Sequence, residues 1–216
     1  HYTGLPNINI LFFTINEDGL KIPINLAYHS RGIKVEEISP RVCLGWALNY
    51  GGQITRQIRG KADEDRYGYF DNSLVFKDVF TDIDVRTGLV SNYANNPDMD
   101  FYPDQFIFDA NGINGKFIFD YTDKMPIIQK YEDIKIELIE NEPFANFELS
   151  GFIITDKNGI KFYFGLSKDK TRKAISYDST LESSRYTIPG DSYERISTGG
   201  DSFPNTWQLM EIQTPN

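Results

Sequence analysis

Carboxylates are the most abundant side chains in this sequence that could do chemistry. Of its 216 residues, 31 are Asp or Glu. A glycoside hydrolase needs two of them about 5–10 Å apart across a sugar cleft. Most of the acids lie in polar, turn-rich stretches, where solvation is a sufficient reason for them. We therefore rank glycoside hydrolysis third among the functions considered.

Three acids in one loop have a spacing that suggests a cation site. Calcium binds carboxylates and carbonyls of loops, and Asp98, Asp100 and Asp104 lie in such a segment. The segment lacks the glycine and the terminal glutamate of an EF-hand loop. We therefore interpret these acids as structural or solvated, and we predict no metal and no cofactor.

Nucleophilic catalysis finds little support in the sequence. The two histidines, His1 and His29, are far apart, and His29 is predicted to be a hydrogen-bonded turn residue. The single cysteine, Cys43, lies in an apolar run, which is typical of a small core residue. The sequence has no nucleophile elbow of the form G-x-S-x-G and no G-x-G-x-x-G phosphate loop. We therefore expect no enzyme.

Four aromatic residues are candidates for stacking on sugar rings, whose apolar faces match flat aromatic side chains. Trp46 shares a strand face with leucines two residues away on either side, so we predict that it is buried in the core. Tyr67 and Tyr69 flank a glycine in a polar loop and form the candidate ligand surface. Trp207 is assigned to a closing strand.

Composition and charge exclude several classes of partner. The formal net charge is −9, which disfavours nucleic acid, because phosphate binding depends on clustered Lys and Arg. It also disfavours an anionic membrane surface. The one basic cluster, Lys168–Lys173, contains an acid and is predicted to be a solvated loop. No run of about 18 apolar residues is present, so no membrane insertion is expected.

The stretch from Leu20 to Gly60 organises the chain. Apolar residues alternate with others from Leu20 to Tyr28, the period of a half-buried strand. A glycine-rich turn surrounds Trp46, and a further strand follows at 53–59. Glycines at 45, 51 and 52 suggest positive φ or a close approach of the backbone to a large ring.

The rest of the chain is also predicted to be mainly strand. The first strand should form a hairpin with the second through a turn at 17–19, and further hairpins are expected at 105–121 and 151–165, where Asn-Gly pairs supply the turns. A strand is expected at 134–138 and a closing strand at 207–214. One or two short helices are predicted within 65–100. A flexible loop region is predicted at 61–104, and a long loop or a flexible hairpin at 176–206. The predicted fold is all-β, an antiparallel sandwich-like domain or partly open shell built of hairpins.

Several motifs resemble one known family. TGLPNINI, PINLAYHSRGIKV, LGWALNYGGQITRQIRG and PDQFIFDANGINGKFIFD resemble the N-terminal region of bacterial Rhs/YD-repeat proteins. These are large secreted or surface proteins in which Tyr–Asp repeats build a hollow β-shell, often around a toxin. The motifs are also similar to the opening domain of insecticidal toxin-complex shells. The resemblance covers most of 3–60, 98–121 and 150–165 and the closing TWQLMEIQTPN, with Cys43 where relatives often carry Gly or Val.

The resemblance implies a scaffold with no catalytic residues to carry over. Its structural motif in this chain comprises Tyr28, Gly32, Gly45, Trp46, Gly51, Gly52 and Arg56. We expect residues 1–216 to form one β-rich domain, the N-terminal module of a longer, exported bacterial protein whose export signal lies outside this piece. The module would initiate or plug a β-shell, with the downstream YD-repeat region of the same chain as its partner.

Two further expectations follow. The second-ranked function is a carbohydrate-binding module that recognises a cell-surface glycan. The closing strand, Trp207 to Thr214, is predicted to be an unfinished sheet edge. We nevertheless expect a monomer, because the net charge opposes self-association and Pro215 removes a hydrogen-bond donor at that edge.

Overall fold

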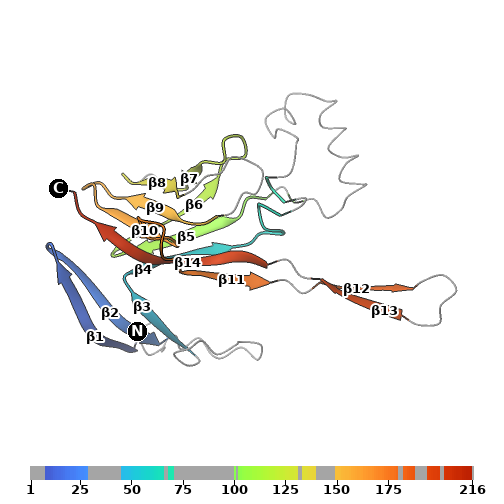
Figure 1. Cartoon of the computed structure of the whole chain (residues 1–216), viewed down its shortest axis with the longest axis horizontal. Helices are drawn as coiled ribbons and strands as arrows, with labels where there is room; N and C mark the ends of the chain where they lie inside the picture. The colour runs from blue at the N-terminus through green and yellow to red at the C-terminus, as the bar shows by residue number, and fades with distance from the viewer. Residues whose placement is uncertain are drawn as a thin grey trace, which may run out of the picture.

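The described part of the chain is all-β and antiparallel, as the alternation predicts (Figure 1). The computed structural model describes residues 8–28, 45–65, 68–70, 100, 102–130, 133–139, 149–179, 182–187, 194–199 and 202–215, with only the backbone for 182–187 and 194–199. It contains no helix within these residues. Most residues of the stretch 65–100, where helices are predicted, are not among those that the structure describes. His1, His29 and Cys43 also lie outside the described residues.

A three-stranded sheet is formed by the N-terminal part of the chain. Its strands are β1 (Ile8–Glu17), β2 (Leu20–Tyr28) and β3 (Trp46–Tyr50). The β1–β2 hairpin turns at Asp18 and Gly19, both with positive φ, so the predicted first hairpin and its turn are confirmed. The chain then passes through Gly51 directly into the second sheet.

A nine-stranded sheet forms the body of the molecule, in the order β7-β6-β5-β4-β14-β10-β9-β8, with β11 also pairing β14. Its strands are β4 (Gly52–Gln57), β5 (Gln105–Ala110), β6 (Ile113–Phe119), β7 (Pro126–Ile128), β8 (Lys135–Leu138), β9 (Phe152–Thr155), β10 (Lys161–Phe164), β11 (Ile175–Ser179) and β14 (Ser202–Gln213). The predicted hairpins at 105–121 and 151–165 are β5–β6 and β9–β10. The first turns at Asn111–Gly112, while Asn114 and Gly115 lie inside β6.

The large sheet curls around an aromatic core. Phe117 of β6 and Phe152 of β9 have ring centroids 5.5 Å apart, although four strands separate β6 from β9 in the sheet order. In a flat sheet, strands about 4.8 Å apart would hold these rings more than about 20 Å from each other. The core also contains Phe106, Phe108 and Trp207, all essentially without solvent exposure.

The first half of the closing strand lies inside this sheet, so the prediction of an unfinished edge is wrong for Trp207 and Gln208. From Leu209 to Gln213 the strand pairs β10 alone among the described strands. β14 pairs β4 through Thr206–Gln208, and β10 and β11 follow one another along its other edge. Trp207 anchors it by donating from Nε1 to the Leu149 carbonyl at 2.7 Å. Among the described residues, the side of Leu209–Gln213 away from β10 has no strand partner, so the sheet keeps an edge there.

Two other expectations can be compared with the structure. Of the two alternatives predicted for 176–206, a long loop or a flexible hairpin, the structure shows hairpin pairing: β11 and the start of β14 pair, and β12 (Glu182–Thr187) and β13 (Glu194–Gly199) form a hairpin that extends away from the body (Figure 1). Trp46 is half-buried on β3, not in the core. Within the described residues no second layer covers that end of the small sheet, and Trp207 is the core tryptophan instead.

Candidate functional site

The described residues bring one group of charged side chains together inside the protein, around Arg56 of β4. Arg56 occupies an inward position, two residues after the core residue Ile54. Its Nε donates to Asp104 Oδ2 at 2.7 Å, and its terminal nitrogens donate to both carboxylate oxygens of Glu64 at 2.7 and 2.5 Å. A planar guanidinium suits such paired contacts better than any other cation.

Asp104 connects this arginine to the backbone of two segments. Its Oδ1 accepts from the Arg59 N–H at 2.8 Å, and its Oδ2 accepts from the Asp63 N–H at 3.2 Å. Asp63 Oδ1 accepts in return from the Asp104 N–H at 2.9 Å. The chain after β4 and the chain before β5 are thus held side by side by reciprocal bonds.

Asp63 is the unusual member of the group. It has no solvent exposure, and its Oδ2 has no hydrogen-bond partner. Burial, and after it the negative charge of Asp104, raise the pKa of Asp63 to about 8. A proton on Asp63 at neutral pH relieves the cost of a second buried carboxylate.

The neighbouring groups respond to the same burial. The pKa of Asp104 is also raised by burial, although the nearby Arg56 guanidinium opposes that shift. Burial works against the charge of Arg56, but the hydrogen bond to Glu64 and the surrounding carboxylates outweigh it and raise the arginine pKa. Arg56 therefore stays charged in its buried position.

Asp100 makes a further connection between the segment that follows β4 and the segment that precedes β5. Its two oxygens accept from the N–H groups of Lys61 and Tyr102, at 2.8 and 3.0 Å. Gly60 lies against this carboxylate with φ of +94°, and a Cβ there would collide with it. Asp100 and Asp104 thus use their oxygens on backbone N–H groups, as structural acids do.

This arrangement holds two segments together and offers no reacting group to a substrate. Asp63 and Asp104 are both fully buried, so neither faces a cleft in which a sugar could lie. Of the proposed calcium ligands, Asp98 lies outside the described residues, and within those residues no three acidic, histidine or cysteine side chains are placed to hold a metal ion.

The residues of the predicted structural motif are distributed over both sheets. Tyr28 and Trp46 are cross-strand partners with ring centroids 5.1 Å apart. Gly45, Gly51 and Gly52 all have positive φ, as predicted. At Gly52 a Cβ would collide with the Asp109 carbonyl. Arg56 is the centre of the charged group, and Gly32 lies outside the described residues.

Half of the predicted ligand surface can be placed. Tyr69 is half-buried, with its ring 5.5 Å from that of Tyr121 and 5.8 Å from that of Phe70. Burial raises the pKa of Tyr69 to about 12. Tyr67 lies outside the described residues, and Trp207 is fully buried, so no stacking platform forms from these aromatics in the described chain.

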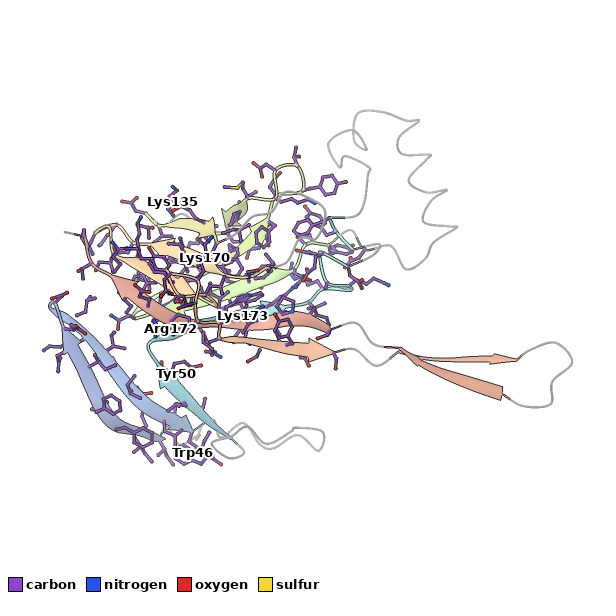
Figure 2. The ribbon with its side chains drawn as sticks, in the orientation of Figure 1. Trp46, Tyr50, Lys135, Lys170, Arg172 and Lys173 are labelled. Atoms are coloured by element: carbon purple, nitrogen blue, oxygen red, sulfur yellow. The ribbon has the colours of Figure 1, made fainter. Side chains whose placement is uncertain are left out.

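A groove of about 460 Å³ lies between the two sheets. One wall belongs to the small sheet and the other to the C-terminal half of β14. The lining residues are Ile15, Glu17, Asp18, Leu20, Ile22, Tyr50, Leu209, Met210, Glu211, Ile212 and Thr214. Figure 2 shows Tyr50 at the end of β3 next to the large sheet and Trp46 at the far end.

The predicted solvated loop at Lys168–Lys173 is confirmed, because all six residues are exposed.

Sequence reasoning identified Arg56 as a motif residue but missed its partners. An arginine at an inward position of an alternating strand is itself a signal that a buried carboxylate must lie nearby.

Within the described residues, no helix is long and apolar enough to cross a membrane. Comparison with protein-family models, with curated proteins and with solved structures finds no match to this chain.

Proposed function

We propose that this chain is a non-catalytic structural module of a secreted or cell-surface bacterial protein of the Rhs/YD-repeat kind, in which it initiates or plugs a β-shell. The downstream repeats of the same polypeptide are its partner. The observation that carries the proposal is the role of the motif residues that can be placed. Tyr28 and Trp46 contact each other across the small sheet, Gly51 and Gly52 lie where the chain passes from one sheet to the other, and the buried charged group around Arg56 fixes the path of the chain.

Gly51 and Gly52 illustrate this role. They lie where the chain leaves the small sheet and enters the large one, and the residue after Gly51 pairs at once with Ala110. A side chain at Gly51 would press against Leu209 and Ile22, on opposite sides of the groove. Glycine suits this position because side chains of both sheets pack against its backbone and its φ is +105°.

The first experiment is to read the gene beyond Asn216. Tyr–Asp repeats after this residue are expected, and their absence would count against the family and the shell. Electron microscopy of the complete protein should then show a hollow shell. A variant that lacks residues 1–216 should be secreted but fail to assemble that shell into a closed particle.

A glycan array with the purified chain tests the two other functions considered. No glycan should be retained, and no oligosaccharide should be cleaved. Retention of a glycan that is lost on Tyr69→Ala, with no change in melting temperature, would favour the carbohydrate-binding module. Tyr102→Ala is the matched control, because Tyr102 is an exposed tyrosine on a neighbouring segment.

A further inference from the structure

One face of the small sheet consists of apolar and aromatic side chains, apart from Glu17 at its end. In an antiparallel pair, residues directly opposite each other share a face, so the strand registers define its members. They are Ile8, Ile10, Phe13, Ile15, Leu20, Ile22, Ile24, Leu26, Tyr28, Trp46, Leu48 and Tyr50. We call this set the apolar face. The opposite face is mixed: it carries Asn9, Lys21 and Asn49 together with Leu11, Pro23, Ala27 and Ala47.

The apolar face is only partly covered. Ile8, Ile10, Phe13, Ile15 and Leu48 are 42, 44, 57, 41 and 38% exposed. At about 200 Å² for a large side chain, these five alone expose on the order of 400 Å². The half-buried members add to this and bring the area towards the roughly 800 Å² that each partner contributes to a stable interface. A soluble protein rarely leaves such a patch bare.

β1 also offers a backbone edge next to this face. Within the described residues it pairs with β2 alone. Its ten residues include no proline and a single charge, that of Glu17. A bulge between Leu11 and Phe13 is its one irregularity. Natural edge strands usually carry charges or proline that prevent pairing, so β1 is suited to accept another strand.

The charge at one end of the face indicates what that strand must carry. The apolar face ends in the groove, whose lining among the described residues includes Glu17, Asp18 and Glu211 and no Lys or Arg. The Glu211 carboxylate accepts from the Lys168 N–H at 3.1 Å, so Glu17 and Asp18 are the acids left at this end of the face. A second copy of this chain would bring a net charge of −9 and the same acids to this place. A basic residue on the occupant complements the groove, and like charges oppose self-association.

We propose that the apolar face, its β1 edge and the groove bind a β-strand from elsewhere in the same polypeptide, with apolar side chains towards the face and a Lys or Arg beside Glu17 and Asp18. This inference rests on the proposed function, because it takes the chain to be one module of a longer protein. The added strand would extend the small sheet and fill the groove between the two sheets.

The test measures thiol labelling by a maleimide in the complete natural protein and in the 216-residue chain, both carrying Cys43→Ser. Phe13→Cys reports on the apolar face, and Asn9→Cys is the matched control on the opposite face of the same strand. In the complete protein, labelling of Phe13→Cys should slow by roughly tenfold or more, because reaction then requires local opening. Labelling of Asn9→Cys should be similar in both proteins.

A separate double variant tests whether the acids at the end of the apolar face are needed for binding of the strand. Glu17→Lys with Asp18→Lys in the complete protein should restore fast labelling of Phe13→Cys, since both substitutions place positive charge beside the basic residue of the strand. Ile10→Cys replaces Phe13→Cys if the latter does not fold.

Three outcomes overturn the inference: equal labelling in the two proteins, protection in the 216-residue chain that grows with its concentration, or a reading frame that adds nothing to these residues. The second would mean that another copy covers the face. A protected face in a complete protein without Tyr–Asp repeats would support this inference and reject the proposed function. An unprotected face in a protein with such repeats would do the reverse.

Discussion

Arg56 Nε and Asp104 Oδ2 lie 2.7 Å apart, and neither side chain has any solvent exposure. This ion pair connects the middle of β4 to the residue that precedes β5. Desolvation of two charges is costly, and the pair is tolerable because Glu64 and several backbone N–H groups satisfy the remaining hydrogen-bonding positions. The pair therefore fixes the position of the chain immediately before β5 begins.

Removing the arginine should unfold much of this region. Arg56→Met leaves Asp104 and Glu64 without their cation, and loss of one partner of a buried pair costs about 3–5 kcal/mol. Chemical denaturation of the parent and the variant measures the change. Lys135→Met is the control, because its ion pair with Glu137 is exposed and should contribute less than about 1 kcal/mol. Equal effects of the two substitutions would contradict the structural role of Arg56.

The buried Asp63 should make stability depend on pH in the opposite sense to an ordinary paired acid. Its pKa is about 8 in the folded protein and 3.8 in the unfolded reference. Between these values the folded state binds more protons than the unfolded state, so this residue lowers the free energy of unfolding as pH rises. The effect begins near pH 4 and is complete above about pH 8.

Asp63→Asn should remove that dependence, because the amide oxygen can still accept from the Asp104 N–H and the group cannot ionise. The stability of the variant relative to the parent is expected to increase between pH 4 and pH 8 and to level off above. Urea titrations at several pH values measure this difference. A difference that stays constant with pH would show that Asp63 is ionised in the folded protein.

Gly52 should not tolerate a side chain. Its φ is +147°, and a Cβ would collide with the Asp109 carbonyl in the next strand. Gly52→Ala should cost about 1–3 kcal/mol from backbone strain alone, with more from the displaced ladder. Gly19→Asn is the matched control, since Gly19 has positive φ and open space, and asparagine adopts this conformation readily. Thermal melts of the two variants should differ clearly, and a parent-like melt for Gly52→Ala would contradict the close approach.

The two tryptophans should differ in their contribution to stability. Trp207 is fully buried, and Trp207→Ala should cost about 3–5 kcal/mol. Trp46 is half-buried, so Trp46→Ala should cost roughly 1–2 kcal/mol at about 25 cal/mol per Å² of apolar surface. Denaturant titrations give both values. A cost for Trp46 equal to that of Trp207 would mean that another part of the protein covers the small sheet.

The class of fold and most of the local pairing could be predicted from the amino-acid sequence. Alternation of apolar residues identifies a strand whenever one face is buried, and Asn-Gly or Asp-Gly turns close neighbouring strands into hairpins. The hairpins β1–β2, β5–β6 and β9–β10 could therefore be predicted, because each depends on residues close together in the chain. The positive φ values at Gly45, Gly51 and Gly52 were predictable for the same local reason.

Which strands are central and which side chains are buried depends on contacts between residues that are distant in the chain. The pattern around Trp207 is the same for an edge strand and for a central one, and β14 became central through β4, β10 and β11, which are distant in sequence. Alternation likewise places Trp46 on an apolar face without showing whether a second layer covers it. The pairing of Arg56 with Asp104 joins residues 48 positions apart, and a buried charge finds its partner through the folded backbone, not through spacing along the chain.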